Sequence, residues 1–379
     1  MDATNNLELP QEMSEHIMNF LRYDLKSLKS CRLVCKSWSI AARPDLFRTL
    51  VVDETNIEAI IAIPAILSPY FKVMPYVKEI NLQTVQYFTA FKSPNSILTS
   101  LSSTLTSIRL FRCYLDTFVE LVDAIQMFPC LKDLTLENID WKVADTRGVS
   151  PHNNWSPSTL TRLRLKNTRM SSFVQWILGL KESLVISEFE ATPVKEEDLP
   201  SVCKFCLTIS GTVKCLRLHI DANGLFTSYT PSNSALGQGC ILDTQIAKLY
   251  STAFNMTEYR TLGIFSKLES LHIDKFMNSS RDDQCDSVFW TPQIMSKIDP
   301  PHVFKYLTLQ LVISRTGELD QYGHRWDFFD EALGGDIFIN FQYLEFEVVG
   351  KVDLEAVVSL LSHHLPRLAS RGRLRFSYL

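Results

Sequence analysis

The chain has 379 residues, of which 46% are hydrophobic, 11% aromatic and 21% charged. This composition is typical of a globular protein with a large core, and it excludes disorder along the whole chain. The 38 basic and 42 acidic residues give a net charge of −4. Such a balance argues against binding to nucleic-acid phosphates, so we expect no nucleic-acid partner.

The chain starts with a polar, acidic segment, whereas a secretory signal needs a basic start and an apolar core. The most apolar stretch, 57–67, is interrupted by Glu58 and Pro64 and is shorter than the ~20 residues of a membrane helix. The nine cysteines are scattered between Cys31 and Cys285, which favours buried thiols in a reducing compartment over a disulfide scaffold. We therefore expect a cytoplasmic or nuclear protein without a membrane span.

Residues 9–50 carry the pattern of three short helices, with Pro10 in the first turn of the first helix. That helix carries one apolar stripe at helical spacing, formed by Met13, Ile17, Phe20 and Leu21. Asp24 is expected to cap the second helix. The third helix is expected to place four residues on one face, namely Cys31, Cys35, Trp38 and Ala42. Pro44 discourages its continuation past Arg43.

This helical segment holds more apolar surface than it can bury. At ~40 residues it is usually too small for an independent core. Its large apolar side chains, each worth ~1.5–3 kcal/mol when buried, are Leu9, Ile17, Phe20, Leu21, Leu25, Leu28, Leu33, Val34 and Trp38. The excess must therefore meet either the rest of the chain, as a helical cap on the following domain, or another protein.

The same residues fit a known motif at nearly every position. The segment opens with Leu9, Pro10 and Glu12, and it continues with Ile17, Leu21, Asp24 and Leu25. It closes with Val34, Cys35, Lys36, Trp38, Leu46 and Phe47. In this pattern the segment Leu9–Leu50 resembles an F-box, the element that binds the Skp-type adaptor of SCF (Skp–cullin–F-box) ubiquitin ligases.

The resemblance implies a Skp-type adaptor as a partner and, through the adaptor, a cullin. By position, the family-type residues for adaptor binding are Leu9, Pro10, Ile17, Leu21, Leu25, Leu28, Val34 and Trp38. Some of these residues are expected to face the adaptor and others to hold the helices together, and the sequence does not separate the two groups.

A hexad of the form apolar–x–x–apolar–x–apolar recurs through the rest of the chain. Clear copies start at Val77, Leu105, Leu131, Leu160, Val213, Leu268, Phe304 and Phe341, a weaker copy starts at Ile186, and a truncated one lies near Leu374 and Phe376. The early copies recur every 26 to 29 residues, a period typical of leucine-rich repeats. Each hexad predicts a strand, and helical patterns follow over 116–127, 171–180 and 353–365.

We therefore expect an α/β protein in which a three-helix F-box precedes an irregular leucine-rich-repeat solenoid. The predicted domains are an F-box over 1–50, a connecting segment over 51–76 and a solenoid over 77–379. The turns fit the family loosely, because only the copy at Leu105 reaches the fuller pattern, with Cys113. Three longer gaps, 221–239, 279–301 and 314–336, read as insertions. The alternative is an α/β protein whose strands merely look alike.

No catalytic motif is present in the sequence. The lone C-x-x-C of Cys203 and Cys206 lacks a second pair or suitably spaced histidines, so we expect these cysteines to pack in the core and expect no metal or cofactor. The polar middle positions of the hexads should form a ladder across the sheet, because neighbouring strands lie ~4.8 Å apart. These positions are Asn81, Arg109, Thr135, Arg164, Arg217, His272, Thr308 and Glu345.

The centre of this ladder looks basic in the sequence. We therefore hypothesise that it binds an acidic or phosphorylated target protein through Arg109, Arg162, Arg164, Lys166, Arg217, His219 and His272. The alternative is an ordinary polar surface. Together the two segments predict a non-catalytic substrate receptor of an SCF-type ligase. Two alternatives remain, an F-box scaffold acting outside ubiquitination and a solenoid-based enzyme with an unrecognised site.

Overall fold

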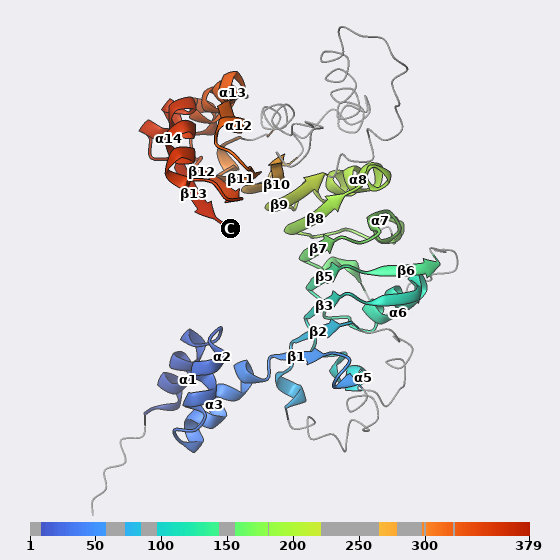
Figure 1. The fold of residues 1–379 in the computed structure, drawn as a ribbon. Helices are drawn as coiled ribbons and strands as arrows, with labels where there is room; N and C mark the ends of the chain where they lie inside the picture. The colour runs from blue at the N-terminus through green and yellow to red at the C-terminus, as the bar shows by residue number, and fades with distance from the viewer. Residues whose placement is uncertain are drawn as a thin grey trace, which may run out of the picture. The chain divides into compact units, whose positions relative to one another are not determined.

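The structure is a computed structural model that describes residues 9–57, 73–84, 97–143, 156–180, 182–220, 265–278, 298, 301–320 and 323–379. It divides into two compact units, Met1–Thr159 and Leu160–Leu379, and Figure 1 shows their elements. None of the helices in these ranges combines the length and the apolar character that a membrane span requires.

The first unit opens with three helices, α1 (Gln11–Phe20), α2 (Leu25–Cys31) and α3 (Lys36–Leu46). Asp24 caps α2, as predicted, because its side chain accepts hydrogen bonds from the backbone N–H groups of Lys26 and Ser27. A further bond from the Ser27 hydroxyl and these backbone bonds lower the pKa of Asp24. The three helices share a small core of Met18, Leu28 and Ala42.

Two details of the third helix differ from the prediction. Cys31 ends α2 and Cys35 is the N-cap of α3, so these two cysteines do not share a face of one helix. The helix also continues through Pro44 to Leu46. Proline disfavours a helical conformation in the residue before it, but this is a preference only, and Leu46 packs against the small core.

The first unit continues with parallel strands that pair in chain order. These are β1 (Thr49–Val52), β2 (Glu79–Gln83), β3 (Ser107–Phe111) and β5 (Asp133–Glu137). The other described elements of this unit are η1 (Met74–Tyr76), α5 (Ile97–Leu101), β4 (Tyr114–Thr117), α6 (Phe118–Gln126), β6 (Asp140–Val143) and η3 (Pro157–Thr159). Strand β1 was not predicted, and it crosses the expected domain boundary at residue 50.

A recurring turn ends several strands. Thr84, Arg112 and Asn138 directly follow β2, β3 and β5, and all three have positive φ angles. The conformation is unfavourable for Thr and Arg, but it directs their backbone N–H groups at the neighbouring repeat: the Thr84 N–H donates to the Phe111 carbonyl and the Arg112 N–H to the Glu137 carbonyl, each at 2.9 Å.

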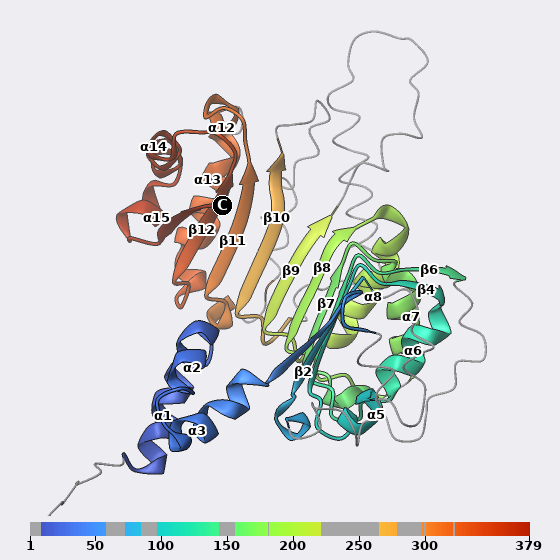
Figure 2. The ribbon, with the colours of Figure 1, turned by 60° about the horizontal axis from the view of Figure 1, so that its bottom comes forward.

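The second unit contains seven described strands. Each pairs in parallel with the next strand along the chain (Figure 2). They are β7 (Arg162–Lys166), β8 (Glu188–Val194), β9 (Cys215–Ile220), β10 (Ser270–Asn278), β11 (Tyr306–Val312), β12 (Tyr343–Val349) and β13 (Leu374–Tyr378). Every predicted hexad, including the weak copy at Ile186, coincides with a strand in one of the two units. The predicted strands are thus confirmed.

The described helices of the second unit are α7 (Met170–Gly179), α8 (Leu199–Ile209), α12 (Gly317–Asp320), α13 (Gly323–Gly334), α14 (Leu354–His364) and α15 (Pro366–Ser370), with 3-10 turns η4 (Glu196–Asp198), η6 (Pro301–Val303) and η7 (Asp336–Phe338). The helices predicted over 171–180 and 353–365 are present, as is α6 within 116–127. The gap 314–336 is not a plain loop, because it holds α12 and α13. The expected insertion 221–239 and nearly all of 279–301 lie outside the described residues.

Alternation along the strands separates an apolar face from a polar face. In β7, for example, Leu163 and Leu165 are buried, whereas Arg162, Arg164 and Lys166 are half-exposed. The same alternation recurs in β2, β5 and β12. A period of two is what a strand produces when only one face meets a core, so the second face remains open for polar contacts.

A buried carboxylate stabilises the last helices. Asp330 on α13 is 5% exposed, and it accepts hydrogen bonds from the backbone N–H groups of Arg367 (3.0 Å) and Leu368 (2.9 Å) at the start of α15. We expect Asp330→Ala to lower the free energy of unfolding by about 2–3 kcal/mol, because it leaves two N–H groups without acceptors. Urea denaturation measures this loss. Asp327→Ala on the exposed side of the same helix is the control, and an equal loss there would contradict this role.

Candidate functional site

The three N-terminal helices leave a large apolar surface exposed. Leu33 is 83% exposed and Phe20 is 78% exposed. We call the full set the apolar helical surface, and it comprises Leu9, Met13, Phe20, Tyr23, Leu25, Leu33, Val34 and Ile40. It accounts for half of the large exposed hydrophobic residues in the described part of the chain. A concentration of exposed apolar side chains on one short segment is a feature of protein-interaction sites.

The structure separates the residues that the F-box resemblance had grouped together. Leu9, Pro10, Leu25 and Val34 are exposed, and partly buried positions are held by Ile17, Leu21 and Trp38. Leu28 is 0% exposed. Leu28 was predicted to bind the adaptor, and the structure corrects this. Its side chain fills the core between Met18 and Ala42 and offers no atoms to a partner.

The apolar stripe predicted on the first helix is not the face that α1 buries. Met13 and Phe20, which the sequence placed on this stripe, are exposed, whereas the buried residues of α1 are Ser14 and Met18. A polar residue such as Ser14 does not predict a buried position from sequence. Its small side chain can be buried because its hydroxyl donates a hydrogen bond to the Pro10 carbonyl at 3.5 Å. Met13 and Phe20 are consequently exposed and can contact another protein surface.

The polar face of the second unit carries the predicted ladder. Parallel register places Arg164, Glu190, Arg217, His272, Thr308 and Glu345 side by side across β7 to β12. In the first unit Asn81, Arg109 and Thr135 are aligned in the same way. The sequence prediction left out Glu190, because its hexad is the weak copy, and Arg375, which lies opposite Glu345 on the last strand.

The ladder is not a free basic surface, which corrects the expected electrostatics. Arg162 contacts Glu188 at 2.5 Å, and Arg109 contacts Glu137 at 2.6 Å. Carboxylates on adjacent strands therefore neutralise the cations that were expected to bind an acidic target. The prediction rested on basic residues at and beside the middle of each hexad, and it left out the carboxylates of Glu137, Glu188 and Glu190 that pair with them.

Glu190 is the centre of the densest part of this network. Its side chain is 10% exposed, and its carboxylate lies 2.9 Å from Lys166 Nζ, 3.4 Å from Arg217 Nε and 3.5 Å from Arg164 Nε. A concavity of about 190 Å³ is lined by Glu190, Arg164 and Arg217 together with Cys215, Ser270 and His272. His219 is half-buried on β9. The face thus offers both signs of charge at fixed positions.

Arg217 also binds Asp274 with two parallel hydrogen bonds, from Nη2 to Oδ1 at 2.7 Å and from Nε to Oδ2 at 3.0 Å. Burial alone would raise the pKa of Asp274, but its contacts with His272 and Arg217 outweigh burial and hold that pKa at about 2. Asp274 is therefore a carboxylate at neutral pH.

Comparison with known proteins identifies the helical segment. A family model described as F-box-like matches residues 7–53, in agreement with the resemblance of Leu9–Leu50. Among solved structures, the chain is similar to a crystal structure of a Bacteroides fragilis protein, with 8% identity and a TM-score of 0.40 over 88% of this chain and 74% of that chain. A likeness at this level does not bear on function. The search of curated proteins finds no match.

Proposed function

We propose that the chain is the substrate-recognition subunit of an SCF-type E3 ubiquitin ligase. The observation that carries the proposal is the apolar helical surface, because it lies on the segment that matches the F-box-like family. Exposed Leu, Val, Phe and Tyr side chains lose hydration on docking and are worth ~1.5–3 kcal/mol each when fully buried. A Skp-type adaptor is the partner that F-box domains generally bind.

The strand–helix part of the chain would act as a leucine-rich-repeat solenoid that holds the target protein. Its polar face presents rigid, paired charges, so it fits a target surface that carries both signs of charge better than a uniformly acidic one. This replaces the phosphorylated segment as the favoured target. In this role the chain is non-catalytic and acts by proximity, since tethering raises the effective concentration of target lysines. The ligase function places it in the cytoplasm or nucleus.

The second candidate is a scaffold that binds the adaptor outside ubiquitination. The same apolar helical surface favours it, because docking an adaptor does not by itself require a cullin. A solenoid-based enzyme has no comparable support among the described residues.

Co-purification of the full chain distinguishes these functions. We expect the wild-type chain to retain both the adaptor and a cullin from cell extract, and we expect ubiquitin conjugates to form when the charged conjugating enzyme is added. Retention of the adaptor without the cullin would favour the scaffold. Failure to retain a purified adaptor at micromolar concentration would contradict both.

A further inference from the structure

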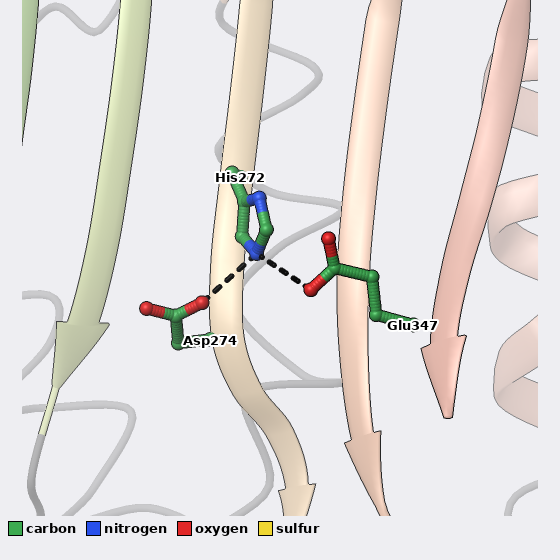
Figure 3. A group of neighbouring side chains, drawn as sticks. All are labelled: His272, Asp274 and Glu347. Carbon is green, nitrogen blue, oxygen red and sulfur yellow. Dashed lines mark ion pairs between the residues drawn. The ribbon is translucent and has the colours of Figure 1, made fainter. Parts of the chain in front are cut away.

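Three side chains of the second unit converge on one point of its polar face (Figure 3). His272 and Asp274 lie on β10, and Glu347 lies on β12, beyond β11. His272 Nε2 is 2.9 Å from Asp274 Oδ1 and 3.4 Å from Glu347 Oε2. The three potential ligand atoms all lie within 4.8 Å of one another. The side chains are 15%, 12% and 19% exposed respectively.

Two of these atoms are buried without a hydrogen bond among the described residues. These atoms are His272 Nε2 and Glu347 Oε2, which are shielded from solvent although the ring lies within ion-pair distance of both carboxylates. A buried polar atom left in this state destabilises a fold. The two atoms face the same point. They therefore indicate a ligand that accepts lone pairs from both, as a metal ion does.

The charge balance is compatible with a cation. Asp274 and Glu347 supply two negative charges, and Arg217 returns one positive charge through its contact with Asp274. Each carboxylate oxygen has two lone pairs, so Asp274 Oδ1 can accept from Arg217 and still coordinate an ion. Arg217 would then fix the orientation of the carboxylate, as the outer partners of metal ligands do.

We propose that His272, Asp274 and Glu347 bind a divalent transition-metal ion such as Zn²⁺. One imidazole nitrogen and two carboxylate oxygens suit Zn²⁺ and its neighbours better than Ca²⁺ or Mg²⁺. Ligands at ~2.1 Å in a tetrahedron lie ~3.4 Å apart, which is the Nε2–Oε2 separation. Three protein ligands leave a fourth position open to water or to a side chain of a bound protein. The proposal stands independently of the ligase function.

The sequence could not show this site, and no metal was expected from it. His272 had been assigned to target binding, and Glu347 is supplied by a strand two further along the sheet. No short motif joins them. Only the parallel register of β10, β11 and β12 brings the three side chains together.

Calorimetric titration of the full chain with Zn²⁺ tests the proposal. We expect the wild type to bind one ion at this site, and we expect His272→Gln and Glu347→Gln each to weaken that binding at least about 100-fold, the upper range for loss of an outer-shell contact. Glu345→Gln, a neighbouring carboxylate on the same strand, is the control and should leave the affinity unchanged. Circular dichroism checks that each variant is folded.

Absorption spectra with Co²⁺ separate this site from the cysteines. Binding at a nitrogen–oxygen site gives weak visible bands that both variants abolish, whereas thiolate ligands give strong near-ultraviolet bands. Absence of binding in the wild type, or equal affinity in a folded Glu347→Gln variant, would overturn the proposal. In that case ion pairs of His272 with the two carboxylates would explain the geometry.

Discussion

Replacing Leu33 and Val34 together by alanine is expected to weaken binding of a Skp-type adaptor at least about 100-fold without lowering the free energy of unfolding. The two side chains are 83% and 64% exposed, so they contribute little to the folded chain alone. If they are buried at the adaptor, each truncation removes about 1.5–2 kcal/mol, and 1.4 kcal/mol corresponds to a factor of ten in affinity.

The measurement is a titration with purified adaptor, followed for each variant by urea denaturation. Ile337→Ala with Ile339→Ala is the matched control, because these two aliphatic side chains are 70% and 69% exposed on the second unit. That control should bind the adaptor as the wild type does. Equal affinity of the Leu33/Val34 variant would exclude the apolar helical surface as the docking site.

The contrast with Leu28 shows what the family pattern alone cannot resolve. An F-box motif records which positions are apolar, but it does not record whether a side chain meets its own helices or a partner. Leu28 is enclosed with Met18 and Ala42, whereas Leu33, only five positions away, projects into solvent. The difference arises because Arg32–Val34 leave the helix in the turn between α2 and α3.

The strands were predictable because their signal is local. A hexad such as Leu160–Leu165 already contains the buried side chains of β7, Leu163 and Leu165. Strand β1 escaped because Thr49–Val52 has no hexad, and it is specified instead by its pairing with β2, where Thr49 lies opposite Glu79. Parallel pairing between distant segments cannot be predicted from the residues of either segment alone.

The same reason explains the error about the basic ladder. The periodic pattern placed Arg164 and Arg217 correctly on one face, but their electrostatic environment depends on Glu190 and Asp274 from other strands. The alignment of strands that made the ladder predictable also brings the opposing charges into contact. An arginine already paired in this way loses an ion pair before it can bind a target.

Reversing both arginines, Arg164→Glu with Arg217→Glu, is therefore expected to unfold the second unit more readily instead of only removing target binding. Glu190 and Asp274 have side chains only 10% and 12% exposed. They would lose guanidinium partners and gain like-charged neighbours. Breaking a buried pair destabilises by about 3–5 kcal/mol, and the arginines are nearly 40% exposed, so solvent reduces this. We expect a loss of about 4–6 kcal/mol for the double change.

Urea denaturation at low and high salt measures the effect, and the loss should shrink at high salt because salt screens the new repulsion. Lys142→Glu with Lys214→Glu is the control, since both lysines form ion pairs at well-exposed positions, 79% and 56% exposed, where each pair contributes only about 0–1 kcal/mol. If the Arg164/Arg217 variant unfolded like the wild type yet failed to bind its target, the arginines would be available for recognition and the network would be only a polar surface. A stability loss confined to that variant would assign the two arginines to the integrity of the sheet, and target binding would then have to be tested at residues outside the network.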